Sequence, residues 1–534
     1  MADESRNGGD RAYVPRRKRR RVESLAASTA TPSAPSLPHS LPSPYAASAE
    51  QEAEWARRER GISVEGEGPI PTSVHSFADL PISVEVIAVL QSRGVMVPSP
   101  IQAQALPCVF QGRDVVALAP TGSGKTLCYI LPMLALLQQQ QQQQQQSLVG
   151  ASGVYANHYP GAATSNAPAS PVALVVVPTR ELMDQVVQDL KAFFSGSSGA
   201  PVVGVCGGVA LDDQLAQLKL YSCLAMTVVA TPGRLLHLVE RHGAALSLAR
   251  LALLVVDEVD RVLQAPEMEA QLRLILQLAN AAGRQTLLFS ATLPAFLPRL
   301  ARSAVLRPVT VRVGNASVPG KTPSVSVRPQ SQPLNETSTS MLALSTTSKV
   351  THDVQFMRGA EKPSRLLRVL RATERPPVLV FCNSRASVDR VARLLRSEQF
   401  HAAPLHGGQS QGYRTQALRA FRAGYVDVLV ASDVASRGLD LPGVDHVVLF
   451  DMPLSIEDYV HRCGRTGRHP GGDTGDCSTM GKATSFLTRE CAIAAELKEV
   501  LRTAKQPVPR ELDLPNRFHP PPIASLRDSS QAEQ

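Results

Sequence analysis

A glycine-rich segment has the residue types of a phosphate-binding loop. Residues 119–126 read APTGSGKT and follow the β-branched run DVVAL. Such a turn between a strand and a helix directs backbone N–H groups at phosphates near the positive end of the helix dipole. Lys125 adds positive charge, and the hydroxyl of Thr126 is a ligand for Mg²⁺. The segment therefore predicts a site for a nucleoside triphosphate.

An acidic pair further along the chain supplies the other half of such a site. Residues 257–260 read DEVD and end the apolar run LALLVV. Asp257 would hold Mg²⁺ from the end of a strand, and Glu258 would orient or deprotonate the attacking water. Alone, a GKT loop arises by chance in long chains, and an acidic pair is often only a solvated loop. Both motifs lie at strand ends in the expected order, which favours one shared site for phosphoryl transfer.

Length and composition indicate more than one domain. The chain has 534 residues, and 43% of them are hydrophobic, which is enough for more than one packed core. The formal net charge of +9 suits an anionic partner such as nucleic acid, although the excess is small for this length. Much of the excess lies in the basic run RRKRRR at residues 16–21. The rest of the chain is therefore only mildly basic.

The same basic run bears on localisation. We interpret residues 16–21 as a nuclear import signal; the alternatives are a solvated basic tail that holds RNA weakly and a cytoplasmic location. Acidic residues nearby disfavour an organelle transit peptide: Asp3, Glu4, Asp10 and Glu23. The N-terminus lacks the apolar segment of a secretory signal, and no apolar run reaches the ~18 residues that span a bilayer. We expect an intracellular chain without a membrane partner. Its eight cysteines lack zinc spacing and suggest reduced core thiols.

Apolar periodicity divides the chain into two halves. Residues 1–55 are rich in Ser, Pro and Ala and are expected to be disordered. Residues 75–315 alternate helical patterns with short β-branched runs, and the expected strands are DVVALAP, ALVVVPT, MTVVATP, ALLVVDE and TLLFSAT. The rhythm returns over residues 350–515 in PVLVFCN, HAAPLHG, VDVLVASD, HVVLFD and ATSFLT. Each half is therefore expected to be an α/β domain with a parallel sheet flanked by helices.

Other segments interrupt or end this pattern. Residues 316–349 are rich in Ser, Thr and Pro, which predicts a flexible linker that lets the halves move. The run Gln138 to Gln146, with the Gly/Ala/Ser stretch after it, is expected to be a solvated surface loop, and residues 471–480 a second insertion. Residues 516–534 form a tail.

The order of the short motifs from Phe77 to Arg468 resembles that of DEAD-box ATP-dependent RNA helicases. The set includes APTGSGKT, PTRE, TPGR, DEVD, SAT, SDVASRGLD and YVHRCGRTGR, and DEVD carries Val259 where the family name implies Ala. The resemblance implies two tandem RecA-like domains. It also implies an enzyme that couples ATP binding and hydrolysis, to ADP and phosphate, to local RNA duplex unwinding or RNP remodelling. ATP and Mg²⁺ are the implied cofactors, and RNA and RNP proteins the implied partners.

The resemblance extends to the nucleotide site. The segment GVMVPSPIQ, residues 94–102, resembles the family's adenine-reading motif. Gln102 would hydrogen-bond the adenine edge and Phe77 would stack on its face, with a buried Gln and a core Phe as alternatives. The implied nucleotide contacts are Phe77, Gln102, Ala119, Pro120, Thr121, Gly122, Ser123, Gly124, Lys125, Thr126 and, near the ribose, Asp440.

The resemblance also assigns catalytic and coupling roles. Arg465 and Arg468 would reach the γ-phosphate as arginine fingers from the second domain, so catalysis would require closure of the two halves. The implied catalytic set is Lys125, Asp257, Glu258, Arg465 and Arg468, with Thr126 and Asp257 as Mg²⁺ ligands. Hydrolysis would be coupled to RNA release by Asp260, Ser290, Thr292 and His461, although the hydroxyls could equally make local turn bonds.

The implied RNA contacts are short polar motifs at strand ends and helix starts. Such residues suit phosphate and 2′-OH contacts, which position a strand without reading its bases. Aromatic residues make up only 4% of the chain, so base stacking is not expected to dominate. The implied residues are Pro178, Thr179, Arg180, Gly207, Gly208, Thr231, Pro232, Gly233, Arg234, Gln411, Arg414, Ser432 and Asp433.

Two other functions remain open at this point. Val259 and the long linker motivate an ATP-gated RNA clamp or scaffold with negligible turnover. A DNA helicase would share the two-domain core. Hydrolysis that disappears in Glu258→Gln excludes the clamp, and stimulation by RNA but not DNA excludes the DNA helicase.

Overall fold

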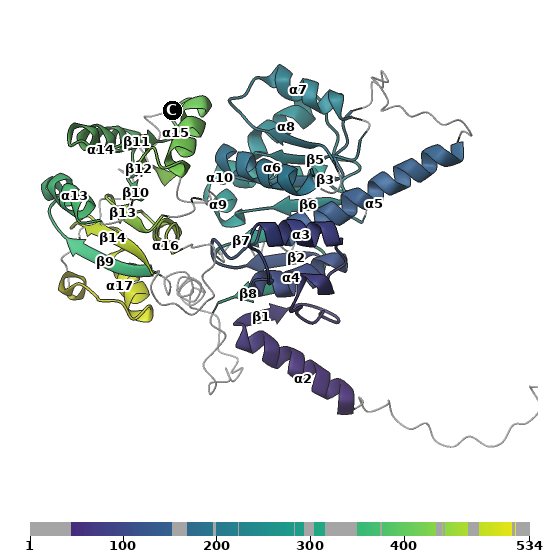
Figure 1. Ribbon diagram of the computed structural model, residues 1–534, viewed down its shortest axis with the longest axis horizontal. Helices are drawn as coiled ribbons and strands as arrows, with labels where there is room; N and C mark the ends of the chain where they lie inside the picture. Colours follow the sequence, from purple (N-terminus) through teal and green to yellow (C-terminus); the bar gives the residue numbers. More distant parts are fainter. Residues whose placement is uncertain are drawn as a thin grey trace, which may run out of the picture. The chain divides into compact units, whose positions relative to one another are not determined.

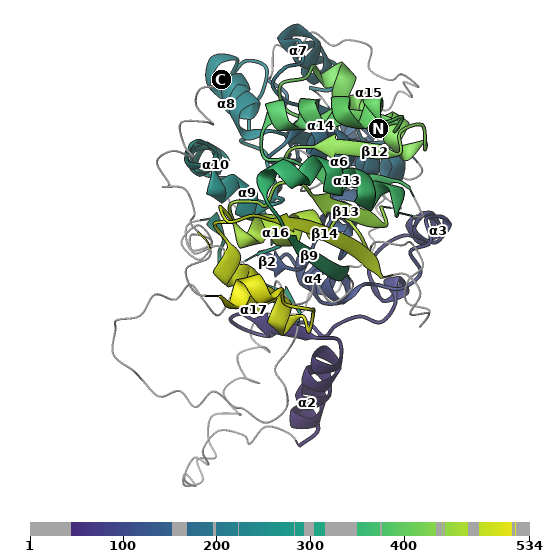
Figure 2. The ribbon, with the colours of Figure 1, turned by 90° about the vertical axis from the view of Figure 1, so that its left-hand side faces the viewer.

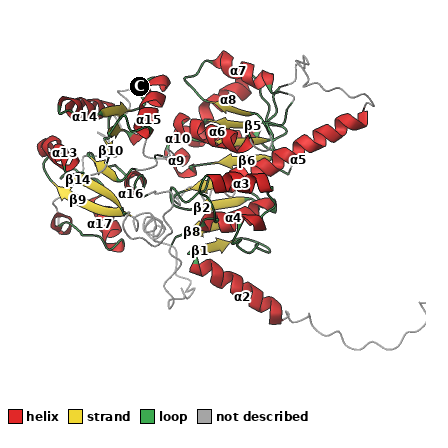
Figure 3. Cartoon of the chain, in the orientation of Figure 1, coloured by secondary structure: helices red, strands yellow, loops and turns green. Residues whose placement is uncertain are grey.

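Two α/β bodies with separate sheets make up the described chain (Figure 1, Figure 3). The structure is a computed structural model, and it describes residues 44–151, 168–195, 199–222, 224–281, 283–292, 304–314, 350–373, 376–433, 441, 444–467, 480–514 and 518.

The first sheet has eight strands in the order β1-β8-β2-β7-β6-β3-β5-β4. They are β1 (Ile62–Glu65), β2 (Val115–Leu118), β3 (Ala173–Val176), β4 (Val202–Val205), β5 (Thr227–Ala230), β6 (Leu253–Val256), β7 (Gln285–Ser290) and β8 (Val309–Val313). β1 pairs with β8 in the antiparallel sense, and the other pairs are parallel. Parallel strands are covered on both faces, which explains why most of them are unbroken apolar runs.

Helices cover both faces of this sheet. Strand alternation sends Val115 and Ala117 of β2 to one apolar cluster and Val116 and Leu118 to the other. The first cluster takes α3 (Val84–Ser92), α4 (Pro100–Phe110), α5 (Leu127–Ala151) and α6 (Arg180–Phe194). The second takes α7 (Leu211–Leu220), α8 (Pro232–Arg241), α9 (Val259–Gln264) and α10 (Pro266–Leu278). The remaining elements are α2 (Pro44–Glu59) and the 3-10 turn η1 (Phe77–Asp79).

The second sheet has six parallel strands in the order β11-β12-β10-β13-β14-β9. They are β9 (Val350–Phe356), β10 (Val378–Phe381), β11 (Ala402–Leu405), β12 (Val428–Ala431), β13 (His446–Leu449) and β14 (Gly481–Leu487). β14 and β9 run side by side at one edge (Figure 2).

The second sheet is also covered on both faces. One face packs on α13 (Lys362–Arg371) and α14 (Arg385–Ser397). The other packs on α15 (Gln411–Arg422), α16 (Ile456–Cys463) and α17 (Ala494–Thr503). Two short 3-10 turns, η2 (Gly359–Glu361) and η4 (Arg510–Asp513), complete this half.

The predicted fold class is confirmed. Every apolar run predicted as a strand contains a strand, and both sheets have helices on each face and are parallel except for the edge strand β1, as expected of tandem RecA-like domains. Four strands were not predicted: β1, β4, β8 and β9. Because β1 belongs to the first sheet, that sheet begins before the boundary at residue 75.

Two segments differ from the expectation of disorder or loop. Helix α2 begins at Pro44, inside the predicted disordered tail of residues 1–55. The run Gln138 to Gln146 continues helix α5 instead of forming a loop, because glutamine is a good helix former and the helix is already nucleated at Leu127. The predicted linker at 316–349, residues 471–479 of the second insertion, the basic run and the C-terminal residues from 519 onward lie outside the described residues.

Two further expectations concern cysteines and membranes. Those cysteines whose state the structure gives are unpaired and buried, in agreement with core thiols. Within the described ranges, no helix combines the length and apolar character needed to cross a lipid bilayer.

Candidate functional site

The loop of residues 119–126 joins β2 to α5, as the motif predicts. Gly122 and Gly124 have φ of 81° and 86°, in the left-handed region that glycine adopts without a steric penalty. The Nζ of Lys125 donates to the carbonyl oxygens of Ala119 at 2.5 Å and Pro120 at 3.1 Å. Its ammonium group therefore lies inside the loop, where phosphate oxygens would be bound.

The predicted adenine-reading segment is tied to this loop. Ser99 Oγ donates to the carbonyl of Ser123 at 2.7 Å, and Gln102 Nε2 donates to that of Gly124 at 2.9 Å. The Oε1 of Gln102 accepts from the backbone N–H of Ser99 at 2.9 Å. Both ends of the Gln102 amide thus have protein partners, and Phe77 is buried in the core. The structure therefore agrees with the alternatives of a buried Gln and a core Phe. Contact of either residue with adenine stays a prediction.

The contact between Gly124 and Gln102 leads to a test of the loop. A Cβ at Gly124 would collide with the amide nitrogen of Gln102, whereas a Cβ at Gly283, with φ of +79°, meets nothing within 4 Å. Gly283→Ala is therefore a control for the cost of the positive φ alone. It should lower the free energy of unfolding by roughly 1–2 kcal/mol. Gly124→Ala should lose about 1–3 kcal/mol more from overpacking, and it alone should weaken ADP binding. Denaturant unfolding and ADP titration measure both effects; equal ADP affinity in both variants would contradict the close packing.

The acidic pair lies at the end of β6, next to the loop. The Oδ1 of Asp257 accepts from the backbone N–H of Glu258 at 2.8 Å. Glu258 adopts φ 50° and ψ 48° and precedes α9. Burial raises the pKa of the Asp257 carboxyl, with the Lys125 charge opposing it. Burial also raises the pKa of Glu258 to about 7, with Arg261 and Arg465 among the opposing charges.

Sequence reasoning missed Tyr129, which joins the two predicted Mg²⁺ ligands. Its hydroxyl donates to Asp257 Oδ2 at 3.1 Å, and it is also hydrogen-bonded to the Thr126 side chain. The ring is fully buried and lies 5.4 Å from that of Phe289 on β7. The only indication of this role in the sequence is that Tyr129 lies one helical turn after Thr126. A hydroxyl and a carboxylate oxygen held together suit the hard, oxygen-preferring Mg²⁺ ion.

The predicted coupling residues meet at a single carboxylate. The Oδ2 of Asp260 accepts from Thr292 Oγ1 at 3.1 Å and lies 3.5 Å from His461 Nε2 on α16. Asp260 and His461 are both buried. Ser290 behaves differently, because its hydroxyl donates to the carbonyl of Thr292 at 2.6 Å, which is the local turn bond considered as the alternative.

Of the two predicted arginine fingers, the structure describes Arg465 but not Arg468. Arg465 is 1% exposed, and its Nε donates to the carbonyl of His461 at 3.1 Å. Its charge lies close enough to Glu258 to oppose the rise of that pKa. Arg468 lies outside the described residues, as does Asp440, the predicted ribose contact.

Asp433, predicted to contact RNA, is engaged within the protein. Its two carboxylate oxygens accept from Nε and a terminal nitrogen of Arg462 at 2.9 and 3.0 Å. Arg462 also donates to Asn383 Oδ1 and to the carbonyl of Asp451, each at 2.9 Å. The backbone carbonyl of Asp433 accepts from Arg261 at 3.3 Å. The neighbouring residue, Ser432, donates its backbone N–H to β11. The arrangement assigns Arg462, which the sequence analysis did not single out, a structural role.

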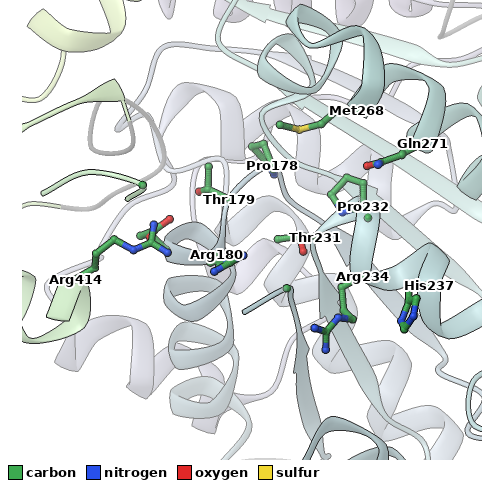
Figure 4. A pocket seen from close by; sticks show the side chains of 14 residues that line it. Pro178, Thr179, Arg180, Thr231, Pro232, Arg234, His237, Met268, Gln271 and Arg414 are labelled. Carbon is green, nitrogen blue, oxygen red and sulfur yellow. The ribbon is translucent and has the colours of Figure 1, made fainter. Parts of the chain in front are cut away.

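Most of the predicted RNA contacts line one pocket of about 560 Å³ (Figure 4). The predicted lining residues are Pro178, Thr179, Arg180, Gly207, Thr231, Pro232, Gly233, Arg234 and Arg414. The pocket is completed by Glu181, the last residue of the PTRE motif, and by residues that were not predicted: His237, Met268, Gln271 and Gly407. Gly208 has φ of +76° and packs against the Arg180 guanidinium, where a Cβ would collide. The structure thus gathers four separate motifs around one cationic recess.

Two predicted RNA contacts on α15 instead bind acidic residues of α6. Arg414 forms a buried ion pair with Glu181. Gln411 Nε2 donates to Asp184 Oδ2 at 3.2 Å, and burial raises the pKa of Asp184, with the Gln411 hydrogen bond opposing it. The residues Glu181 and Asp184 were not predicted as partners, because nothing in the sequence relates α6 to a helix more than two hundred residues later.

Comparison with known proteins agrees with these motifs. Residues 99–300 match the DEAD/DEAH box helicase family, and residues 361–470 match the helicase conserved C-terminal domain. The chain is 35% identical over 473 residues to "ATP-dependent RNA helicase abstrakt" of Drosophila melanogaster, with 87% of this chain and 66% of that protein covered. It is 34% identical to "DEAD-box ATP-dependent RNA helicase 35" of Arabidopsis thaliana, with 85% and 67% covered. The chain thus spans about two thirds of the length of these two relatives.

A solved structure shares the fold. S. cerevisiae Dbp5 bound to RNA and ADP BeF3 is similar with a TM-score of 0.60 at 21% identity, covering 86% of this chain and 98% of that one. At this identity the likeness supports the two-domain fold alone.

Proposed function

This chain belongs to the DEAD-box family of ATP-dependent RNA helicases, and from that premise we propose that it uses Mg²⁺-ATP hydrolysis to separate short RNA duplexes or remodel RNP particles. The observation that carries the proposal is the contact of Asp260 with both Thr292 and His461. It connects the acidic motif beside the phosphate loop to α16, the helix of the second sheet that ends two residues before Arg465.

The nucleotide is held by the loop between β2 and α5. Its backbone N–H groups and Lys125 bind the phosphates. Thr126 and Asp257 would hold the Mg²⁺ ion, and the ion would neutralise charge that develops on the phosphate oxygens. The buried Asp257 carboxyl supports this assignment, because burial raises its pKa and a bound cation would stabilise its charged form. Tyr129 orients this carboxylate and the Thr126 hydroxyl.

Glu258 accepts the proton of the attacking water. Its Oε2 is buried without a hydrogen-bond partner among the described residues. Burial raises its pKa to about 7, close to the operating pH that favours a general base. Arg465 approaches from the second sheet and stabilises negative charge on the γ-phosphate.

RNA binds along the pocket of Figure 4 through its phosphates and riboses. Arg180 and Arg234 supply charge, and the turns at Gly207 and Gly233 let the RNA backbone approach closely. Closure of the two sheets around ATP bends one strand of a duplex, and hydrolysis releases it. This assigns RNA binding to the backbone and leaves base sequence largely unread.

A turnover assay tests the proposal. The purified chain should hydrolyse ATP in the presence of Mg²⁺, and single-stranded RNA should increase the rate at least severalfold. DNA of the same length should not, because it lacks the 2′-hydroxyl. Lys125→Ala should abolish the RNA-stimulated rate in parallel assays of phosphate release. Equal stimulation by DNA would favour the DNA helicase, and ATP-dependent RNA binding without turnover would favour the clamp.

Among the residues that the structure describes, Val259 gives no support to the clamp. Val259 is fully buried and packs in the same apolar cluster as Val262 and Leu263. Its two additional methyl groups, relative to alanine, are therefore accommodated in the core beneath the catalytic residues.

We propose nuclear localisation from the basic run at residues 16–21. A fluorescently tagged chain should accumulate in the nucleus, and replacing the run with alanine should redistribute it to the cytoplasm. If the substituted chain stays fully nuclear, the run is not the import signal.

A further inference from the structure

The RNA pocket has two chemically different walls. Arginine side chains and glycine turns form one wall, which suits phosphate. Helix α10 contributes the neutral residues Met268 and Gln271 to the other, and Figure 4 shows Gln271 on the side of the pocket away from Arg414. Neither residue belongs to a motif that the sequence analysis singled out.

The pocket has room for a larger group than a phosphate. Its volume of about 560 Å³ falls in the range of sites that enclose a whole small molecule. A nucleotide of RNA has a charged phosphate, a hydroxyl-bearing ribose and a flat base. If the cationic wall holds the phosphates, the neutral wall must face the ribose or the base.

Gln271 is placed to meet a hydroxyl group beside the phosphate wall. Its amide packs over Gly233, where a Cβ would lie 3.5 Å from Nε2. Nε2 donates to Glu267 Oε1 at 3.3 Å, which holds the side chain in this position. An amide has two N–H groups and a carbonyl oxygen, so Gln271 can keep this bond and still bind a 2′-hydroxyl.

Met268 lies one helical turn before Gln271 on the same face of α10. It is half-buried, and its thioether lines the pocket. An unbranched, polarisable side chain of this kind adapts to flat apolar surfaces and makes favourable contacts with aromatic rings. It has no means of binding a phosphate.

We propose that Gln271 and Met268 contact the ribose and the base of one nucleotide whose phosphates the motif residues hold. The inference rests on the proposed RNA-binding function and extends it, because it adds a contact to the sugar and base side of the strand. RNA is thereby favoured over DNA at this nucleotide, and an intact base over an abasic position.

Two glutamines on the same helix allow a matched test of the ribose contact. Gln277 is exposed on α10 and lies outside the pocket. Binding of fluorescein-labelled oligouridine is measured by anisotropy with ADP, beryllium fluoride and Mg²⁺. Gln271→Ala should weaken RNA binding about fivefold, as expected for one lost hydrogen bond, and leave binding of the matching DNA unchanged. Gln277→Ala should bind both like the wild type.

Abasic RNA tests the base contact. Met268→Ala should weaken binding of intact RNA about fivefold through lost apolar contact. Binding is then measured for a series of oligomers, each with one abasic position. Met268→Ala should have little effect on the affinity of the one oligomer whose abasic position is the position that Met268 contacts. Thermal unfolding of each variant verifies that the fold is kept.

The possible outcomes distinguish a failure of this inference from a failure of the proposed helicase function. If the wild type binds RNA, and Gln271→Ala and Met268→Ala bind every probe with the affinity of the wild type, the inference is wrong and the helicase proposal stands. If wild type binds no RNA under these conditions, the proposed function itself fails.

Discussion

Replacing Glu258 with glutamine should reduce RNA-stimulated ATP hydrolysis by about 10³-fold, within the range that a general base contributes. Glutamine has nearly the same size and shape but cannot take a proton from water. ADP affinity should be kept, because the phosphate loop and Lys125 are unchanged. Steady-state phosphate release and ADP titration measure the two quantities.

Burial makes the outcome of this substitution diagnostic. Glu258 is only 9% exposed and has an unpartnered buried oxygen among the described residues, and its pKa is raised by desolvation. Removing that charge should leave the unfolding midpoint unchanged or raise it. The loss of rate therefore reports chemistry and not misfolding. Glu85→Gln, an exposed residue in the first turn of α3, is the matched control and should turn over like the wild type. Undiminished hydrolysis by Glu258→Gln would exclude Glu258 as the base.

Arg465→Lys should lower the rate of hydrolysis by about 10³-fold, the low end of the effect of an arginine finger. Lysine keeps the positive charge but loses the planar fork that contacts two phosphate oxygens at once. Substrate binding through the first sheet should change little, so the loss should appear in kcat and not in KM.

The neighbouring arginine supplies a control for this prediction. Arg462 is as deeply buried as Arg465, but its guanidinium binds Asp433, Asn383 and the carbonyl of Asp451. Arg462→Lys should therefore lower the unfolding midpoint of the second domain. Arg465→Lys should leave that midpoint close to the wild type. If both variants lose stability and rate together, Arg465 acts as a structural residue and the finger assignment is wrong.

Two of the strands that sequence reasoning missed differ in a physical way from strands that it found. Strands such as β6 (LLVV) and β10 (VLVF) are buried on both faces and so are continuous apolar runs. β1 (ISVE) and β9 (VTHDVQF) lie at sheet edges, where one side is less covered and polar residues interrupt the run. β1 depends on pairing with β8, about 250 residues later, as in Ile62 opposite Val313. Local patterns carry no information on such a partner.

In the functional site, too, some residues were predicted from local sequence and others depend on distant partners. The residue types and order of Lys125, Asp257 and Glu258 were enough to predict a phosphate and metal site. Tyr129 was missed, because its role depends on Asp257, which is 128 residues away. Asp433 was assigned to RNA from its motif, whereas the fold brings Arg462 against both of its carboxylate oxygens.

The sequence by itself determined the family, the two parallel α/β sheets and the identity of the motif residues. These follow from local apolar runs and from short, ordered residue patterns, which do not depend on how distant segments meet. Only the tertiary structure decided which motif side chains are engaged with each other: Gln102 with the phosphate loop, Arg414 with Glu181, and Asp260 with His461. It also brought Met268 and Gln271 into the pocket that the predicted RNA contacts line. The reason is that a hydrogen bond or ion pair needs partners within a few ångströms, and for these residues packing of the sheets and helices, not spacing along the chain, sets that distance.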